Sequence, residues 1–152
     1  MYVAIIGFMK HPQTLAEKLY QQFPTAKLKN IRDYSCCALV FMWCLGIEPD
    51  DAEAVLTIGR MIDAKAIDKD CTVFWNKACE YLTGRSCDVE FREITSIRSI
   101  KDRTPVRYDY NGHSHWVGVE NGKVEFNTLA HSVCVAKGKP VTARIIKIKG
   151  GK

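Results

Sequence analysis

The chain has 152 residues, of which 47% are hydrophobic, and it carries a formal net charge of +5. A chain of this length can bury about two-thirds of its unfolded surface, so we expect one compact domain over residues 1–152. The basic residues are scattered and have no interleaved aromatic residues, which argues against nucleic-acid binding. No apolar stretch has the length of about 18 residues that a membrane span needs, and the first residues lack the pattern of a signal peptide. We therefore expect a soluble, cytoplasmic protein without a membrane partner.

The first half of the chain has the periodicity of helices. Residues 1–10 are apolar and predict a strand or an arm, whereas residues 28–33 are polar and irregular and predict a loop. Apolar residues at helical spacing, or in an unbroken run typical of a helix buried on every side, occupy the segments 13–23, 36–47, 50–62 and 72–82. The predicted helical half therefore spans about residues 13–84.

The second half, about residues 87–148, has the period of two that a half-buried strand requires. The strand candidates are 89–91, 106–108, 115–119, 124–126 and 141–148. Asn121-Gly122 is a strong signal for a two-residue hairpin turn between the third and the fourth of them. Helices followed by an antiparallel sheet predict an α+β domain.

Three polar residues stand out by their order along the chain. Cys36 opens the buried helix, where unpaired backbone amides and the helix dipole are expected to lower the thiol pKa and favour the nucleophilic thiolate. His115, on the third strand, would take the proton from such a thiol, and Asn127 would fix the orientation of the imidazole. Because the Asn121-Gly122 hairpin joins their strands, we expect His115 and Asn127 to lie close together.

Each of these residues has a neighbour that could replace it or a structural role that could explain it. Cys37 follows Cys36, and adjacent helical positions point about 100° apart, so only one of the two sulfurs can face the histidine. His113 shares a side of the strand with His115, although it follows Asn111-Gly112 and has the context of a turn. Both cysteines could also be core residues, and Asn127 could be a turn residue.

The segments around these residues resemble a known superfamily. Ser35-Cys36-Cys37-Ala38-Leu39 is similar to the Ser-Cys-Trp-Ala-Phe segment of papain-like cysteine peptidases. His115-Trp116-Val117-Gly118-Val119 resembles the His-Phe-Val-Val-Val strand of their small bacterial branch, the bacteriocin-processing (C39-like) peptidases. Thr128 stands where the family has proline after its Asp or Asn, and Cys37 stands where papain-like enzymes have Trp.

The resemblance implies a papain-like fold, with the Cys-bearing helix packed on the sheet, and cleavage of an amide or peptide bond through a Cys36 thioester. It also implies an oxyanion donor six positions before the nucleophile, where this chain has Asn30 in place of glutamine. The substrate would be a peptide or protein. Two alternatives remain: an acyltransferase or deamidase on the same scaffold, and a catalytically silent domain that binds a peptide or a partner protein.

Metal and cofactor sites are not expected. The seven cysteines include no pair at the spacing of zinc ligands, and they are mixed into apolar segments as reduced, buried thiols are. No glycine-rich phosphate loop or dinucleotide fingerprint occurs. Cys44, Cys71, Cys79, Cys87 and Cys134 are therefore expected to serve packing.

Overall fold

The computed structural model describes residues 9–150, so most of the strand or arm expected at residues 1–10 lies outside the described residues. The helices are α1 (Pro12–Gln22), α2 (Ala26–Tyr34), α3 (Cys36–Cys44), α4 (Asp51–Asp63), α5 (Trp75–Thr83) and α6 (Val133–Lys137). The strands are β1 (Cys87–Glu93), β2 (Thr104–Tyr110), β3 (His113–Glu120), β4 (Lys123–Asn127) and β5 (Lys139–Ile148). The prediction of an α+β protein is confirmed.

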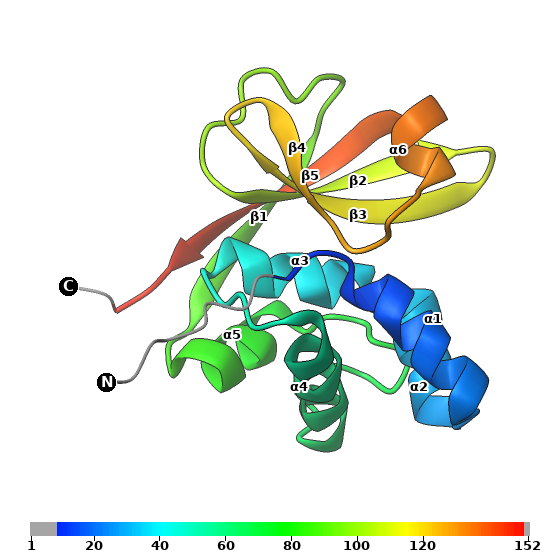
Figure 1. Ribbon diagram of the computed structural model, residues 1–152. Helices are drawn as coiled ribbons and strands as arrows, with labels where there is room; N and C mark the ends of the chain where they lie inside the picture. The colour runs from blue at the N-terminus through cyan, green and yellow to red at the C-terminus, as the bar shows by residue number, and fades with distance from the viewer. Residues whose placement is uncertain (1–8, 151–152) are drawn as a thin grey trace, which may run out of the picture.

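The strands form one antiparallel sheet in the order β1-β5-β2-β3-β4. Figure 1 shows α1 to α5 on one side of this sheet and α6 on the other, with α3 running directly along the sheet. Two groups of buried apolar residues result: a larger one between the helices and the sheet, and a smaller one between the sheet and α6. No helix within residues 9–150 is both long and apolar enough to cross a bilayer.

The loop predicted at residues 28–33 is wrong, because the chain forms α2 there. Thr25 caps this helix by accepting a hydrogen bond from the backbone N–H of Leu28, and Lys29 pairs with Asp33 one turn later. Only Ile31 of α2 is buried, and the helix is strongly polar overall, so its apolar face is narrow and easily missed in the sequence. Its cap and its ion pair stabilise it in place of a broad apolar face.

The other predicted helices are confirmed with small changes of boundary. The helix expected at 72–82 begins at Trp75, because Val73 forms a β-bridge with Ile67 and the β-branched Thr72 and Val73 remain extended. Gly84 ends this helix with a φ of 74°, the left-handed conformation that glycine tolerates best. The short α6 was not expected from the sequence.

A close contact between Trp43 and Gly118 holds α3 against β3. A Cβ atom on Gly118 would come within 2.5 Å of the Trp43 ring, so only glycine leaves room for the indole. The same ring stacks on Phe126 of β4 at 5.8 Å between centroids, and the Arg103 guanidinium lies 4.2 Å from its centre. Trp43 therefore fixes how the helix that begins at Cys36 lies on the sheet.

Candidate functional site

Cys36 lies where two helices meet. Ser35 separates α2 from α3, and the backbone N–H groups of Cys36, Cys37 and Ala38, in the first turn of α3, have no acceptor within that helix. The first bond of α3 is donated by the N–H of Leu39 to the carbonyl of Ser35. The Ser35 hydroxyl is fully buried, forms no cap, and has no hydrogen-bond partner among the described residues. No side chain therefore caps the start of α3.

A pocket of about 590 Å³ adjoins this junction. Both Cys36 and Cys37 line it, together with Ser114 and Trp116 of β3. Its remaining wall comes from the segment before α5 and from the end of α2, namely Asp33, Tyr34, Asp70, Cys71, Thr72, Val73 and Trp75. A ligand in this pocket would lie against the helix start that carries the two thiols.

The Cys36 sulfur lies beside the backbone of β3. Burial raises the pKa of the Cys36 thiol, and hydrogen bonding from the backbone amides of Trp116, Cys37 and Cys36 itself opposes part of that rise. The sequence predicted a lowered pKa from the helix start; the structure gives the opposite net direction, because desolvation outweighs the amides. The resting thiol is therefore protonated at neutral pH.

Cys37 differs from Cys36 in its surroundings. Burial raises the pKa of Cys37 well above its usual value, and the neighbouring Cys36 raises it further, while Arg144 opposes the rise. Unlike Cys36, it gains no lowering of its pKa from backbone amides. Of the two thiols, Cys36 is the one whose thiolate the backbone stabilises.

His115 and Asn127 form a direct hydrogen bond. The Nε2 atom of His115 lies 2.7 Å from Oδ1 of Asn127, across the β3–β4 hairpin. Asn121 and Gly122 form the tip of this hairpin with φ values of 53° and 74°. Positive φ at both residues is what a two-residue Asn-Gly hairpin turn requires. The turn signal and the strand register therefore explain why residues twelve positions apart (127 minus 115) come into contact.

The same bond fixes the proton on the imidazole. The backbone N–H of Leu129 donates to Oδ1 of Asn127, which identifies this atom as an acceptor. Nε2 of His115 must then carry the hydrogen, and Nδ1 of the neutral ring is left with its lone pair. His115 is 5% exposed, and burial lowers its pKa, although the hydrogen bond that the ring donates to Asn127 opposes this shift. The ring is neutral at pH 7 and can accept a proton at Nδ1.

The Cys36 sulfur and the His115 ring approach β3 from different sides and are not bonded to each other. The Cys36 sulfur faces the amide of Trp116, which directly follows His115. Side chains alternate along a strand, so Ser114 and Trp116 point into the pocket while His115 shares the opposite side with Val117. No hydrogen bond joins the Cys36 sulfur to the His115 ring in the part of the chain that the structure describes.

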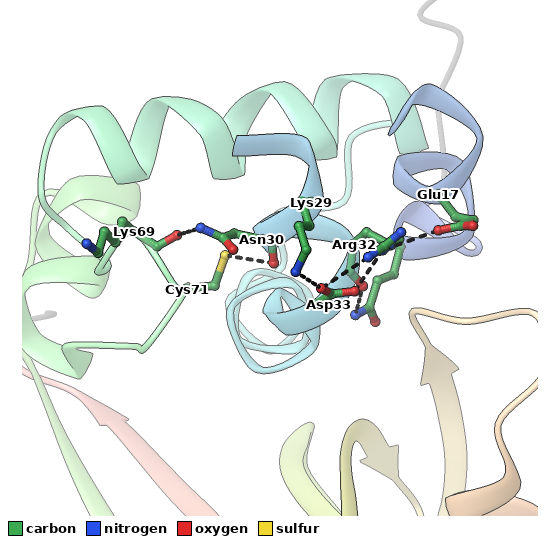
Figure 2. Close-up of polar contacts among 8 residues, drawn as sticks. Glu17, Lys29, Asn30, Arg32, Asp33, Lys69 and Cys71 are labelled. Carbon is green, nitrogen blue, oxygen red and sulfur yellow. Dashed lines mark hydrogen bonds and ion pairs between the residues drawn. The ribbon is translucent and has the colours of Figure 1, made fainter. Parts of the chain in front are cut away.

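The remaining predicted residues lie farther out. His113 is exposed at the start of β3. Asn30 donates from its side-chain amide to the carbonyl of Lys69 at 3.1 Å, and its backbone carbonyl receives the Cys71 thiol at 3.8 Å, as Figure 2 shows. Asn30 does not line the pocket, and its role as an oxyanion donor stays a prediction.

Gln13 is a buried polar residue that the sequence did not single out. Its side chain is 3% exposed, donates from Nε2 to the carbonyl of Arg32 at 2.6 Å, and accepts at Oε1 from the hydroxyl of Thr128 at 2.7 Å. Its backbone N–H also bonds to the carbonyl of Thr128. A polar residue in the first turn of an amphipathic helix is usual, so no sequence signal indicates this pair of contacts.

Within residues 9–150, no group of three or more His, Cys, Asp or Glu side chains is arranged to hold a metal ion. All seven cysteines are free thiols. Comparison of the chain with protein-family models, with curated proteins and with solved structures finds no match.

Proposed function

We propose that this protein is a papain-like thiol hydrolase, similar to the C39-like branch, that cleaves an amide or peptide bond through a Cys36 thioester. The observation that carries the proposal is the buried His115–Asn127 bond, which leaves Nδ1 of a neutral imidazole free to accept a proton. An Asn that orients a histidine and a thiol at a helix start are two of the parts that a nucleophilic cysteine uses. The pocket at Cys36 supplies room for the substrate.

The proposed reaction uses these residues as follows. The Cys36 sulfur attacks the carbonyl carbon of the substrate while its proton passes to Nδ1 of His115. The tetrahedral oxyanion is stabilised by the backbone N–H of Cys36, which is the first residue of α3 and has no acceptor within that helix. The amine leaves with the proton from His115, and water then hydrolyses the thioester. In the resting structure the His115 ring lies on the other side of β3 from Ser114 and Trp116, so the reaction requires a rearrangement on substrate binding that brings the Cys36 sulfur and Nδ1 of His115 together.

Acylation with p-nitrophenyl acetate tests the nucleophile and its base. We expect p-nitrophenyl acetate to acetylate Cys36 and to release p-nitrophenolate, and mass spectrometry locates the acetyl group. This reaction should be lost in Cys36→Ala and retained in Cys37→Ala. His113→Ala is the control for His115→Ala, because both histidines lie on β3 and His113 is exposed. Acetylation that persists in Cys36→Ala, or an equal rate in His115→Ala and the parent protein, would contradict the proposal.

The lowered pKa of His115 predicts a specific pH dependence. Acylation falls as the pH drops through the pKa of His115, which lies below its usual value of about 6.5. Stability has the same sign: below about pH 6.5 the unfolded chain binds a proton that folded His115 does not, so the free energy of unfolding decreases until the folded pKa is reached. Urea titrations between pH 5 and pH 7.5 should show this loss in His113→Gln but not in His115→Gln.

A second reading is a catalytically silent domain that binds a peptide in the same pocket. Two observations favour it: burial raises the pKa of Cys36, and its sulfur makes no hydrogen bond to His115 within residues 9–150. Under this reading p-nitrophenyl acetate labels the exposed lysines and no cysteine preferentially, and Cys36→Ala leaves the rate unchanged. The acylation experiment therefore separates the two readings.

A further inference from the structure

The carbonyl of Arg32 connects Gln13 to the proposed nucleophile. In a continuous helix the carbonyl of Arg32 would accept the backbone N–H of Cys36, four residues later. Here α2 ends at Tyr34, and that carbonyl instead receives the side-chain amide of Gln13 at 2.6 Å. Ser35 is a turn residue between α2 and α3, so the helical ladder is interrupted here and the Cys36 N–H does not continue it to the Arg32 carbonyl.

The other end of the Gln13 side chain bonds Thr128, the residue that follows Asn127. Its Oε1 accepts from the hydroxyl of Thr128, the residue after Asn127, and its backbone N–H bonds to the carbonyl of Thr128 at 3.0 Å. His11 strengthens the same junction, because its Nδ1 lies 3.0 Å from the carbonyl of Asn127. Gln13 and Thr128 are both almost completely buried. A buried polar side chain with both of its ends bonded holds one geometry, since breaking either bond leaves an unpaired buried group.

We infer that Gln13 is a positioning residue of the proposed reaction: it occupies the Arg32 carbonyl so that the Cys36 N–H stays free for the oxyanion, and it fixes Thr128 so that Asn127 keeps its contact with His115. This inference rests on the proposed function. Through these two contacts, one side chain of α1 aligns the start of α3 with the segment that follows β4.

Two reagents distinguish this role from general structural support. Iodoacetamide alkylates a thiol by displacement: a sulfur–carbon bond forms, iodide leaves, and no oxyanion develops. With p-nitrophenyl acetate the sulfur attacks a carbonyl carbon, p-nitrophenolate leaves, and the intermediate carries an oxyanion. Loss of an oxyanion donor therefore slows acylation without an equal effect on alkylation. The quantity to measure is the ratio of the two rates at Cys36.

In Gln13→Met the side chain keeps its length but loses both bonds, so the Arg32 carbonyl becomes available to the Cys36 N–H. We expect the ratio of acylation to alkylation to fall by about tenfold to hundredfold, somewhat less than the loss of a whole oxyanion donor. Thr128→Val removes only the bond to Oε1 and should lower the ratio by less. Gln21→Met is the matched control, because Gln21 lies on the same helix, is exposed, and bonds only Glu17 within residues 9–150.

Amide hydrogen exchange tests the role of Gln13 without requiring that Cys36 react with either reagent. The N–H of Cys36 should exchange more slowly in Gln13→Met than in the parent protein, because it gains the Arg32 carbonyl as an acceptor. An unchanged rate ratio together with unchanged exchange would overturn the inference. If the parent Cys36 reacts with neither reagent, the proposed function fails, yet the exchange experiment still decides whether Gln13 keeps that amide free. If Gln13→Met does not fold, a lowered rate ratio in Thr128→Val supports the inference, and an unchanged one overturns it.

Discussion

The starts of α3 and α4 show two different uses of a helix N-terminus. In α4, Asp50 accepts a hydrogen bond from the backbone N–H of Glu53 at 2.8 Å, and Asp51 and Glu53 place negative charge in the first turn. In α3, Ser35 forms no such bond, the first turn has no acidic residue, and the amides of Cys36 and Cys37 face the Cys36 sulfur. The first arrangement satisfies the orphan donors of a helix with a carboxylate, whereas the second directs them at a thiol that lines a pocket. The absence of a cap at α3 therefore leaves the amides for the thiol, which is why we propose a role for this helix start.

The largest effect on the acylation rate is expected for His115, the proposed base for the Cys36 thiol at the start of α3. His115→Ala removes the proton acceptor and should slow acylation at Cys36 by about 10²–10⁴-fold, the usual contribution of a general base. Asp50→Ala, at the start of α4, should leave that rate unchanged. Stopped-flow measurement of p-nitrophenolate release checks both. Equal rates in His115→Ala and Asp50→Ala would remove the functional difference between the two helix starts.

Glycine substitutions test how firmly each helix is held. In Gly118→Ala the new methyl group overlaps the Trp43 ring, which overpacks the α3–β3 contact and should lower the free energy of unfolding by about 1–3 kcal/mol. Gly59→Ala within α4 is the control, because its methyl group meets only the Lys27 side chain at an ordinary 3.6 Å. That change should stabilise the protein by up to about 1 kcal/mol, since alanine favours the helix. Urea denaturation measures both values.

Asp50→Ala tests the capped helix start directly. It removes the acceptor for the Glu53 N–H and should lower the free energy of unfolding by about 1 kcal/mol. The measurement is the urea midpoint, with Asp50→Asn as the conservative variant that retains an acceptor. A loss of similar size in Asp50→Asn would show that charge and not the cap bond stabilises α4.

Ser35→Ala makes the corresponding change at the uncapped start, and the smallest effect is expected there. The Ser35 hydroxyl is buried and has no partner among the described residues, so its removal breaks no hydrogen bond and relieves an unsatisfied group. We expect a gain in the free energy of unfolding of at most about 1 kcal/mol, measured as for Asp50→Ala. A loss as large as that of Asp50→Ala would mean that Ser35 caps α3 in solution.

Local patterns were sufficient to predict most of the fold. The alternation of the strands and the Asn121-Gly122 turn predicted the hairpin that joins His115 to Asn127, because the register of a two-residue turn is fixed by the turn itself. The helix α2 was missed because it buries one residue, Ile31, and depends on a cap and an ion pair that carry no apolar periodicity. Single side-chain bonds are weak sequence signals, so elements that depend on them are hard to predict.

For the candidate residues, the sequence predicted local positions better than electrostatics. The position of Cys36 at a helix start followed from the pattern, but the direction of its pKa shift depends on how much of the sheet covers it, which is a property of the tertiary structure. The contacts of Gln13 with Arg32 and Thr128 join residues 19 and 115 positions away along the chain. No local rule relates such distant positions.

The strand order has a consequence for synthesis on the ribosome. Strand β5 lies between β1 and β2, so β1 has no neighbour in the sheet until residues 139–148 have emerged. The β3–β4 hairpin is a local contact and can form earlier, whereas the completed sheet requires long-range pairing. A nascent chain halted before β5 would expose a lone strand edge and a half-covered apolar layer, the features that attract chaperones.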